Sequence, residues 1–348
     1  MQASIPSLYF LSKNRIKVVF LYQHKRRRFV IEGIISRVES KDYYLYELKS
    51  HALIRCVLRG KFKKDFSLKK DKLFQTDIAV VGDKVKFDLN DDGTGFIYEI
   101  FPRENYLSRK APRIRGASYR GERLEQIIAA NIDQVFIVTS ISEPNFNHKT
   151  VDRFLVACES SQLNVKIIIN KIDLDKNNSI DYWKSLYSGI GYEVLLTSTK
   201  TNTGIEELKS KLPGKKNLFW GQSGVGKSSL LNKIYPELNL KVGEISNYTS
   251  KGTHTTVTST MFFVGNNTYI IDTPGVREID PYGIKKEDLG HYFIEFTKFI
   301  NECRFNTCTH KHEPGCAVVK AVSEGLISEK RYDSYLRMLE TVEEDINF

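Results

Sequence analysis

The chain has 348 residues, 41% of them hydrophobic, which suits two or three domains with ordinary buried cores. Its formal net charge of +10 favours a polyanionic partner, usually nucleic acid, although a generally lysine-rich proteome would give the same charge. No apolar run approaches the ~20 residues that span a membrane, and the sequence shows no signal-peptide pattern. We therefore expect a cytoplasmic protein with no membrane partner, whose five cysteines are reduced.

The sequence pattern of the first hundred residues changes at position 29, from a basic extension to β-rich runs. Residues 1–28 contain a basic run at 25–28 and are predicted to be a flexible extension. Residues 29–101 contain short β-rich runs separated by polar turns, at 30–38, 43–48, 53–58, 84–89 and 95–100. This spacing predicts a small β-barrel of the oligonucleotide-binding (OB) type, with an SH3-like barrel as the alternative.

Basic and aromatic residues are frequent in the predicted barrel and in the segment that follows it. Those of the barrel are Arg55, Arg59, Lys61, Lys63, Lys64, Tyr43, Tyr44 and Phe62. They would either form an RNA-binding surface or divide into core aromatics and lysines that protect a sheet edge. Residues 102–126 form an arginine-rich linker broken by proline and glycine, which we expect to be mobile alone and ordered on RNA.

Residues 127–283 alternate between strand and helix patterns. Strands are predicted at 134–139, 165–169, 193–196, 218–220, 261–264 and 268–271, and helices at 148–160, 179–188, 204–212 and 229–234. This alternation predicts an α/β domain with a mostly parallel sheet covered by helices on both faces.

Two motifs in this domain suit the recognition of guanine. Residues 170–173 read Asn-Lys-Ile-Asp, and the carboxylate of Asp173 can accept both the ring N–H and the exocyclic amine of guanine, a donor pair that adenine lacks. Asn170 would tie the base to the loops, and the stem of Lys171 would cover a ring face. Ser198 and Thr199 could bring a backbone N–H to the guanine oxygen. Each motif alone is a common turn, but together they predict a site for GTP and GDP.

A phosphate-binding loop follows at residues 221–228, between a short apolar run and a helix pattern. It consists of Gly221, Gln222, Ser223, Gly224, Val225, Gly226, Lys227 and Ser228, with Ser229 opening the helix. Its backbone N–H groups and the helix N-terminus would bind the phosphates. Lys227 would contact the β- and γ-phosphates and stabilise charge during catalysis, and Ser228 would ligate Mg²⁺. A glycine-rich turn without a ligand is the alternative.

The remaining nucleotide-binding candidates lie farther along the chain. Asp272, in Asp-Thr-Pro-Gly after a strand pattern, would hold Mg²⁺ through water, and the Gly275 N–H could meet the γ-phosphate. In the polar stretch 251–256, either Thr255 or Thr256 would complete the Mg²⁺ shell, and we assign Thr256. The guanine motifs precede the phosphate loop, the reverse of most GTPases. The domain is therefore predicted to be circularly permuted.

The last 65 residues, 284–348, contain a cluster of metal-binding residue types. Cys303, Cys308, His310 and Cys316 have the spacing Cys-x4-Cys-x-His-x5-Cys, and three thiolates with one imidazole make a closed tetrahedral shell for one structural Zn²⁺. His312 could replace His310, and free thiols near a loop are the alternative without metal. Helices predicted at 317–324 and 328–344 would pack around this zinc-binding domain.

The order of β-barrel, permuted GTPase and zinc-bearing helical domain resembles the ribosome small subunit-dependent GTPase A family. The resemblance covers nearly the whole chain after residue 29, and its motifs are residues 252–256, residues 272–275 and the Cys303 to Cys316 cluster. It implies His310 as the zinc ligand, an OB barrel, and GTP hydrolysis stimulated by the small ribosomal subunit during its late maturation. Two features depart from the family pattern: Thr253 stands where many members have arginine, and the extension before Phe29 is longer than usual.

The family resemblance also bears on mechanism. Val276 occupies the position where Ras-like enzymes carry the glutamine that orients water, so another group must do this. His254, which matches a histidine implicated in the family, is our candidate. We expect slow basal turnover, on the order of 10⁻⁴ to 10⁻² s⁻¹, accelerated by the small subunit and its rRNA, from a monomer. The alternatives are an RNA-binding assembly factor that uses GTP mainly as a ligand and a GTPase of the large subunit.

Overall fold

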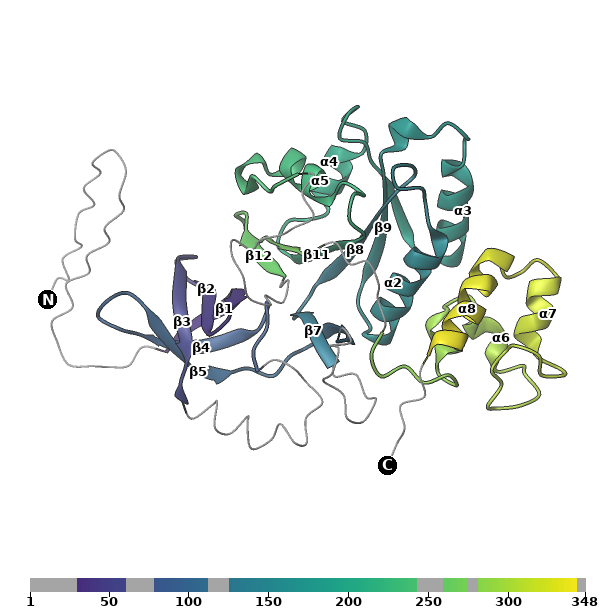
Figure 1. Ribbon diagram of the computed structural model, residues 1–348, viewed down its shortest axis with the longest axis horizontal. Coiled ribbons are helices and arrows are strands. Elements are labelled where there is room, and N and C mark those ends of the chain that lie inside the picture. The colour runs from purple at the N-terminus through teal and green to yellow at the C-terminus, as the bar shows by residue number, and fades with distance from the viewer. Residues whose placement is uncertain (1–29, 61–77, 112–124, 243–258, 275–280, 343–348) are drawn as a thin grey trace, which may run out of the picture. The chain divides into compact units, whose positions relative to one another are not determined.

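The computed structural model describes residues 30–60, 78–111, 125–242, 259–274 and 281–342 (Figure 1). Several predictions fall on residues outside these ranges. They concern the extension 1–28, Lys61, Phe62, Lys63, Lys64, residues 112–124, Thr253, His254, Thr255, Thr256, Gly275 and Val276. Among the described residues, no helix is both long and apolar enough to cross a bilayer.

Five strands close into the N-terminal barrel. They are β1 (Ile31–Glu39), β2 (Asp42–Glu47), β3 (Leu53–Leu58), β4 (Lys84–Leu89) and β5 (Gly95–Ile100). Side chains alternate as the pleat requires: Val85 and Phe87 are fully buried, while Lys84 and Lys86 reach the surface. The barrel closes in the order β1-β2-β3-β5-β4, with β3 parallel to β5. This Greek-key closure confirms the OB-type prediction over the SH3-like alternative.

The linker between barrel and GTPase domain contains regular structure that the sequence did not predict. Strand β6 (Tyr106–Lys110) pairs antiparallel with β7 (Glu125–Ala130). The side chain of Asn105 bonds both backbone groups of Ile132, at 2.7 and 2.9 Å. Arg103, counted among the linker's basic residues, instead forms a two-pronged ion pair with buried Asp83, at 2.7 and 2.8 Å. The expectation of irregular structure was therefore wrong for both ends of this segment.

The GTPase domain is built on a six-stranded sheet in the order β10-β9-β8-β11-β13-β12. Its strands are β8 (Gln134–Ser140), β9 (Val165–Asn170), β10 (Glu193–Leu196), β11 (Lys216–Gly221), β12 (Thr260–Phe263) and β13 (Tyr269–Asp272), of which only β12 runs antiparallel to its neighbour. The central strands are almost continuously apolar because both of their faces are buried.

Helices cover both faces of this sheet, as predicted (Figure 1). They are α2 (His148–Ser160), α3 (Ile180–Ile190), α4 (Ile205–Ser210) and α5 (Lys227–Ile234), with short 3-10 turns η1 (Ile172–Leu174) and η2 (Pro236–Leu238). Phe154 of α2 packs edge-on against Trp220 of β11, and both side chains are buried on the α2/α3 face. Phe136 and Phe219 stack on the α4/α5 face.

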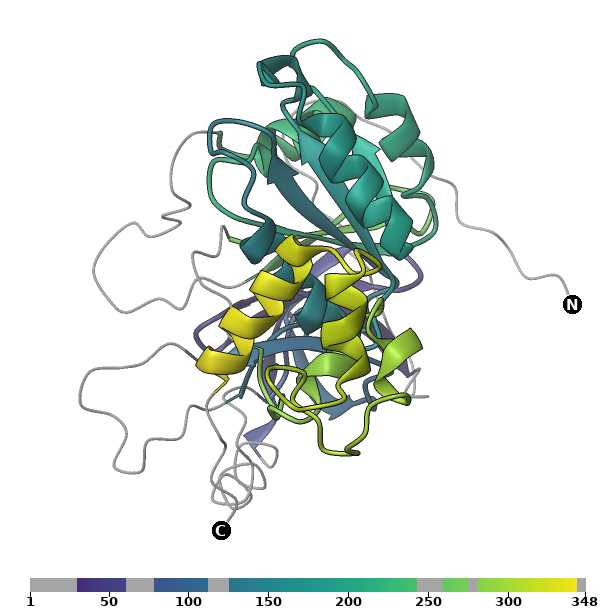
Figure 2. The ribbon, with the colours of Figure 1, turned by 90° about the vertical axis from the view of Figure 1, so that its right-hand side faces the viewer.

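A helical domain with its own core ends the described chain. It comprises η3 (Leu289–Tyr292), α6 (Thr297–Ile300), α7 (Ala317–Ser323) and α8 (Glu329–Thr341). Phe293, Phe296 and Tyr335 form the centre of its core, and Val156 of α2 joins the same cluster. Helix α8 packs against α2 of the GTPase domain, and Figure 2 shows the C-terminal helices, in yellow, facing the viewer. The two helices that the sequence predicted are both present.

The barrel also contacts the GTPase domain. The hydroxyl of Ser36 on β1 donates to the carbonyl of Met261 on β12, at 2.8 Å. His51, in the turn after β2, stacks on Phe263 with ring centroids 3.9 Å apart. The barrel therefore packs beside β12, an edge strand of the sheet.

Candidate nucleotide and metal sites

The predicted phosphate loop lies between the end of β11 and the start of α5. Gly224 and Gly226 adopt left-handed backbone conformations, with φ of +82° and +95°. At residue 226 a Cβ atom would also lie 2.5 Å from the Asn170 side-chain nitrogen, so this position requires glycine. The helix begins at Lys227, two residues earlier than predicted, which places Lys227 and Ser228 in its first turn.

Lys227 and Asp272 influence each other electrostatically. Lys227 is buried, and its Nζ donates to the carbonyls of Gly221 (2.9 Å) and Gln222 (3.3 Å). Burial lowers the pKa of Lys227, and the nearby Asp272 carboxylate opposes this shift. Burial likewise raises the pKa of Asp272 to about 6, against the opposing effect of Lys227.

Asp272 also has an unsatisfied oxygen. Its Oδ1 is buried and has no hydrogen-bond partner among the described residues. A buried carboxylate oxygen costs free energy unless a cation or donor satisfies it, so these residues fit Mg²⁺ with a bound nucleotide. Thr273, whose role the sequence analysis missed, donates from its hydroxyl to the Phe219 carbonyl at 2.9 Å and ties the end of β13 to β11.

At the carboxyl edge of the sheet the first guanine motif contacts the phosphate loop, and the second contacts the first. Buried Asn170 donates to the carbonyl of Val225 at 2.9 Å and accepts from the Thr197 hydroxyl at 3.0 Å. Lys171 donates from Nζ to the carbonyls of Gly224 (2.8 Å) and Glu143. These hydrogen bonds join three loops at this edge. The contribution of Glu143 is a main-chain carbonyl, which leaves no signal in the sequence.

The position of Asp173 is set by the second guanine motif. Its Oδ1 accepts a hydrogen bond from the Ser198 hydroxyl at 2.5 Å. The Ser198 backbone N–H donates to the carbonyl of Thr203 at 3.0 Å, so that N–H has a partner within the chain. Thr199 is half-buried beside it. The carboxylate of Asp173 is thus held at the edge where a base would be read.

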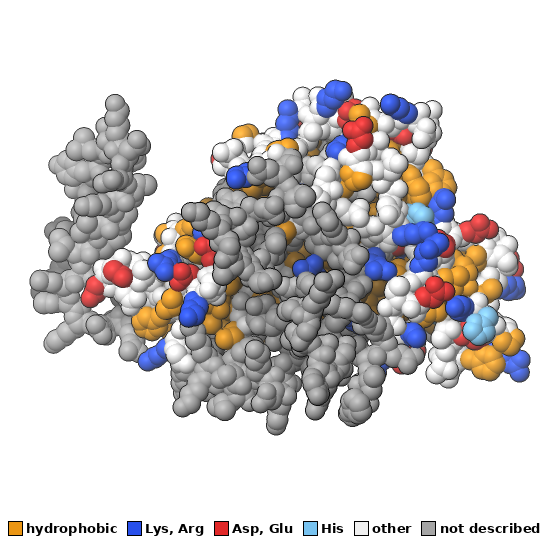
Figure 3. All heavy atoms as spheres, viewed as in Figure 1, with side chains coloured by type: hydrophobic (Ala, Val, Ile, Leu, Met, Phe, Trp, Pro, Cys, Tyr) orange, Lys and Arg blue, Asp and Glu red, His pale blue; other side chains and the backbone are white. Residues whose placement is uncertain are grey.

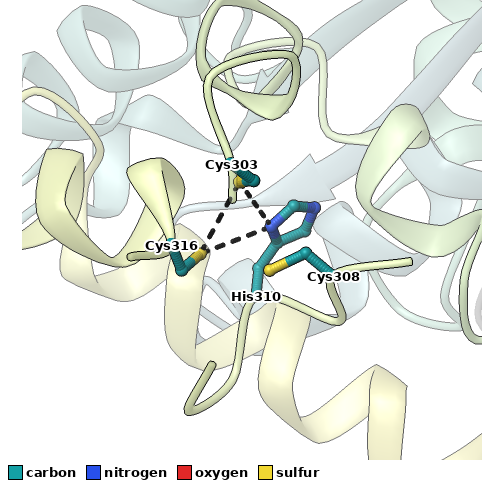
Figure 4. A group of neighbouring side chains, drawn as sticks. All are labelled: Cys303, Cys308, His310 and Cys316. Atoms are coloured by element: carbon teal, nitrogen blue, oxygen red, sulfur yellow. Dashed lines mark hydrogen bonds between the residues drawn. The ribbon is translucent and has the colours of Figure 1, made fainter. Parts of the chain in front are cut away.

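The four predicted zinc ligands come together between α6 and α7 (Figure 4). Nδ1 of His310 lies 3.6 Å from the Cys303 sulfur and 3.5 Å from the Cys316 sulfur, and these two sulfurs are 3.9 Å apart. A tetrahedral zinc ion with bonds of about 2.3 Å to sulfur and about 2.0 Å to nitrogen needs ligand separations of this size. The ligand atoms of the whole cluster, Cys308 included, lie within 4.8 Å of one another. The cluster can hold a metal ion.

Two kinds of side chain hold the loop that carries these ligands. Glu313 accepts hydrogen bonds from the backbone N–H groups of Thr309 (2.8 Å), Lys311 (3.0 Å) and His312 (3.2 Å). Burial alone would raise the pKa of Glu313, but hydrogen bonds from the Thr309 hydroxyl and from the backbone N–H groups of Thr309, Glu313 and Lys311 lower it to about 2. His312 itself is exposed, whereas His310 is buried in the cluster. The hydroxyls of Tyr332 and Tyr335 on α8 donate to three carbonyls of the same loop.

The predicted RNA-binding residues of the barrel divide into two groups. Tyr43 is buried in the barrel core and cannot stack on a base. Arg55 and Arg59 are exposed, with Arg55 paired to Asp42 and Arg59 lying 5.9 Å from the Phe96 ring centre. On the described barrel surface, basic and hydrophobic side chains lie side by side with acidic ones among them (Figure 3).

Comparison with known proteins agrees with this architecture. A family model described as RsgA GTPase matches residues 100–282. The small ribosomal subunit biogenesis GTPase RsgA 2 of Bacteroides thetaiotaomicron is 42% identical over 317 residues, which are 90% of this chain and 98% of that protein. The chain belongs to the RsgA GTPase family. The RsgA of Chlorobaculum tepidum is 37% identical over 319 residues, 90% of this chain and 99% of that protein.

Solved structures support the permuted fold of this RsgA-family chain. YjeQ from Thermotoga maritima matches with a TM-score of 0.71 and 33% identity, covering 90% of this chain and 99% of that one. YloQ, described as a circularly permuted GTPase, matches with a TM-score of 0.67 and 29% identity, covering 92% and 98%. These matches confirm the predicted family, the fold class and the assignment as a GTP-hydrolysing enzyme.

Proposed function

We propose that this RsgA-family GTPase acts in biogenesis of the small ribosomal subunit, and that the subunit stimulates its GTP hydrolysis late in maturation. One observation carries the proposal: the guanine motifs, the phosphate loop and Asp272 converge at one sheet edge, in a chain whose curated relatives are named small ribosomal subunit biogenesis GTPases. GTP hydrolysis there acts as a checkpoint, with the GTP form bound and the GDP form released.

Each part of the site has a role in this proposal. Asn170, Lys171, Asp173 and Thr199 bind the guanine base, Ser198 holds the carboxylate of Asp173 in place, and residues 221–229 bind the phosphates. Asp272 and Ser228 hold Mg²⁺ together with Thr256, and the Gly275 N–H meets the γ-phosphate. The positive charge of Lys227 stabilises the transferred phosphoryl group. His254 positions the attacking water, because Val276 has no group that can do so.

The other two domains supply the contacts to the ribosome. The net charge of +10 and the exposed Arg55 and Arg59 support binding of the barrel to rRNA. The cluster of Cys303, Cys308, His310 and Cys316 holds one structural Zn²⁺, since four protein ligands leave no open position for a substrate. The protein works in the cytoplasm as a monomer.

The test is GTP turnover by the purified chain alone, with isolated small subunits and with isolated large subunits. We expect slow basal turnover and selective acceleration by small subunits. Lys227→Ala should abolish both rates, and Lys233→Ala, on the same helix, serves as its control. Acceleration by large subunits alone would refute the assignment to the small subunit. GTP binding without any stimulated turnover would favour an assembly factor that uses GTP as a ligand.

A further inference from the structure

A fully buried arginine joins the C-terminal domain to the GTPase domain. Arg331 of α8 has a side chain only 1% exposed. Its guanidinium donates to Asp152 of α2 at 2.6 Å and to both oxygens of Glu295, at 2.7 and 3.0 Å. Asp152, which is also fully buried, accepts a further bond from the Tyr187 hydroxyl of α3 at 2.8 Å. Groups on three helices and on the segment before α6 therefore depend on one side chain.

Arg331 keeps its positive charge despite its burial. Burial alone would lower the pKa of Arg331, but the carboxylates of Asp152 and Glu295 raise it. Removing one partner of such a buried pair leaves an uncompensated charge, which costs far more than a surface pair contributes. The relative position of α8 and α2 is thus fixed by this contact more than by exposed pairs such as Lys149–Asp333.

The same turn of α8 holds the metal loop. The Tyr332 hydroxyl donates to the carbonyl of His310 at 2.8 Å, and the Tyr335 hydroxyl donates to the carbonyl of Thr309 at 2.6 Å. These tyrosines lie one and four positions after Arg331. Residues 331–335 of α8 therefore contact both the metal-ligand loop and the GTPase domain.

Helix α2 continues the connection to the nucleotide site. Phe154, two residues after Asp152, packs edge-on against Trp220, with ring centroids 4.3 Å apart. Trp220 immediately precedes Gly221, where the phosphate loop begins. At the start of the same helix, the Thr150 hydroxyl accepts from the side chain of Gln222 in that loop, at 3.4 Å. A change in the position of α2 would reach the phosphate loop through both contacts.

We propose that metal occupancy of the Cys3His cluster and nucleotide occupancy of the phosphate loop are coupled through α8 and α2, with Arg331 as the positioning residue between them. This inference rests on the proposed metal and GTP sites. Metal fixes the carbonyls that hold Tyr332 and Tyr335, these fix α8, and Arg331 fixes α2 against the phosphate loop. Because coupling is reciprocal, bound nucleotide must raise metal affinity by the same factor.

The experiment measures two affinities on the full chain. The dissociation constant for GDP is determined with zinc-loaded and with chelator-stripped protein, and that for Zn²⁺ with and without GDP. We expect zinc to tighten GDP binding about 5- to 20-fold, within the usual range of allosteric coupling, and GDP to tighten zinc binding equally. In Tyr332→Phe/Tyr335→Phe, both ligands should still bind while the ratio approaches one. Tyr182→Phe, an exposed tyrosine on α3, should leave the ratio unchanged.

A second variant covers the case in which the stripped protein does not fold. Asp152→Asn in the zinc-loaded chain should weaken GDP binding severalfold while one zinc per chain remains bound. Equal GDP affinities with and without zinc, or an unchanged ratio in the double tyrosine variant, would refute the coupling. Unaltered GDP affinity in Asp152→Asn would also refute it. If the loaded chain bound no GDP, or no zinc, the proposed sites themselves would be wrong.

Discussion

The nucleotide site and the metal loop are both made of loops, but different structures hold them. Asn170, Gly221 and Asp272 end strands β9, β11 and β13 of one sheet, so buried main chain fixes their positions. The loop with the four metal ligands lies between two short helices, α6 and α7. Its positions depend on side chains, namely Glu313 and the two tyrosines of α8.

This difference predicts opposite behaviour when the ligands are removed. Paired strands of one sheet carry the base-reading and phosphate-binding residues, so we expect these residues to keep their positions when nucleotide is removed. The metal loop, residues 301–316, contains no helix or strand, so we expect metal to contribute much of its ordering free energy. In the nucleotide site the fold positions the residues that bind the ligand, whereas in the metal loop the bound metal completes the fold.

The largest effect should follow loss of the metal. Cys308→Ser, or chelation, should destabilise the C-terminal domain by several kcal/mol, because structural zinc contributes about 10 kcal/mol or more in small zinc domains. Hydrogen exchange should increase at residues 297–316 and remain low in β8 and β11. Cys158→Ala, a buried cysteine outside the cluster, is the control and should keep one zinc per chain. Unchanged exchange at residues 297–316 would contradict the comparison.

A large loss of affinity without unfolding is expected at the guanine edge. Asp173→Asn should weaken GTP binding about 10²- to 10³-fold, because it removes a charged acceptor of two base donors, each worth about 1.5–3 kcal/mol. The melting temperature should change little, since the sheet holds the loop. Competition with ATP measures the loss of selectivity. Asp181→Asn, at an exposed site on α3, is the control, and an unchanged GTP affinity in Asp173→Asn would exclude this residue as the base reader.

The pKa of Asp272, raised to about 6, should make nucleotide binding sensitive to pH. Magnesium needs the carboxylate, so Mg²⁺-dependent GTP affinity should fall up to tenfold for each pH unit below 6 and stay constant above it. The folding stability of the protein without ligand should change with pH in the opposite direction. The contribution of Asp272 to stability is fully present below its ordinary pKa of 3.8 and is lost as pH rises through 6. Titrations between pH 5 and 8 measure the effect, and Asp272→Asn should remove the pH dependence.

The smallest effect should come from Glu313. Glu313→Gln keeps the shape but removes the charge that accepts backbone N–H groups around the metal, so zinc affinity should fall about tenfold, the low end for groups that support ligands. Because its pKa is lowered to about 2, its stabilising effect is present above its ordinary 4.5 and is lost as pH falls toward 2. Competition with a chromogenic chelator measures the affinity. Glu302→Gln, at an exposed neighbouring position, should bind zinc as tightly as the parent protein. Equal zinc affinities of the parent, Glu313→Gln and Glu302→Gln would show that Glu313 does not support the metal site.

The features that sequence alone predicted are those with a local or periodic signature. The barrel strands follow from alternation, and the phosphate loop from glycine spacing before a helix. Contacts between distant residues have no such signature: Arg331 and Asp152 are 179 positions apart, and each looks like an ordinary surface charge on its own helix. The sequence did not predict the pairing of β6 with β7 for a related reason. The burial of Leu107 and Ala129 and the hydrogen bonds of the Asn105 amide stabilise this pairing, although the nearby arginines suggested irregular structure.

The two tryptophans of the chain lie beside the phosphate loop and beside the start of α8. Trp220 is fully buried next to the phosphate loop, so its emission should be blue-shifted and should respond to nucleotide. Trp183 is half-buried, stacks on Phe146 at 4.4 Å and has the Lys330 ammonium of α8 5.9 Å from its ring centre. Its emission should be redder and should follow movements of α8. The protein thus carries one intrinsic fluorescent reporter for the phosphate loop and one for α8, and Trp183→Phe would separate the two signals.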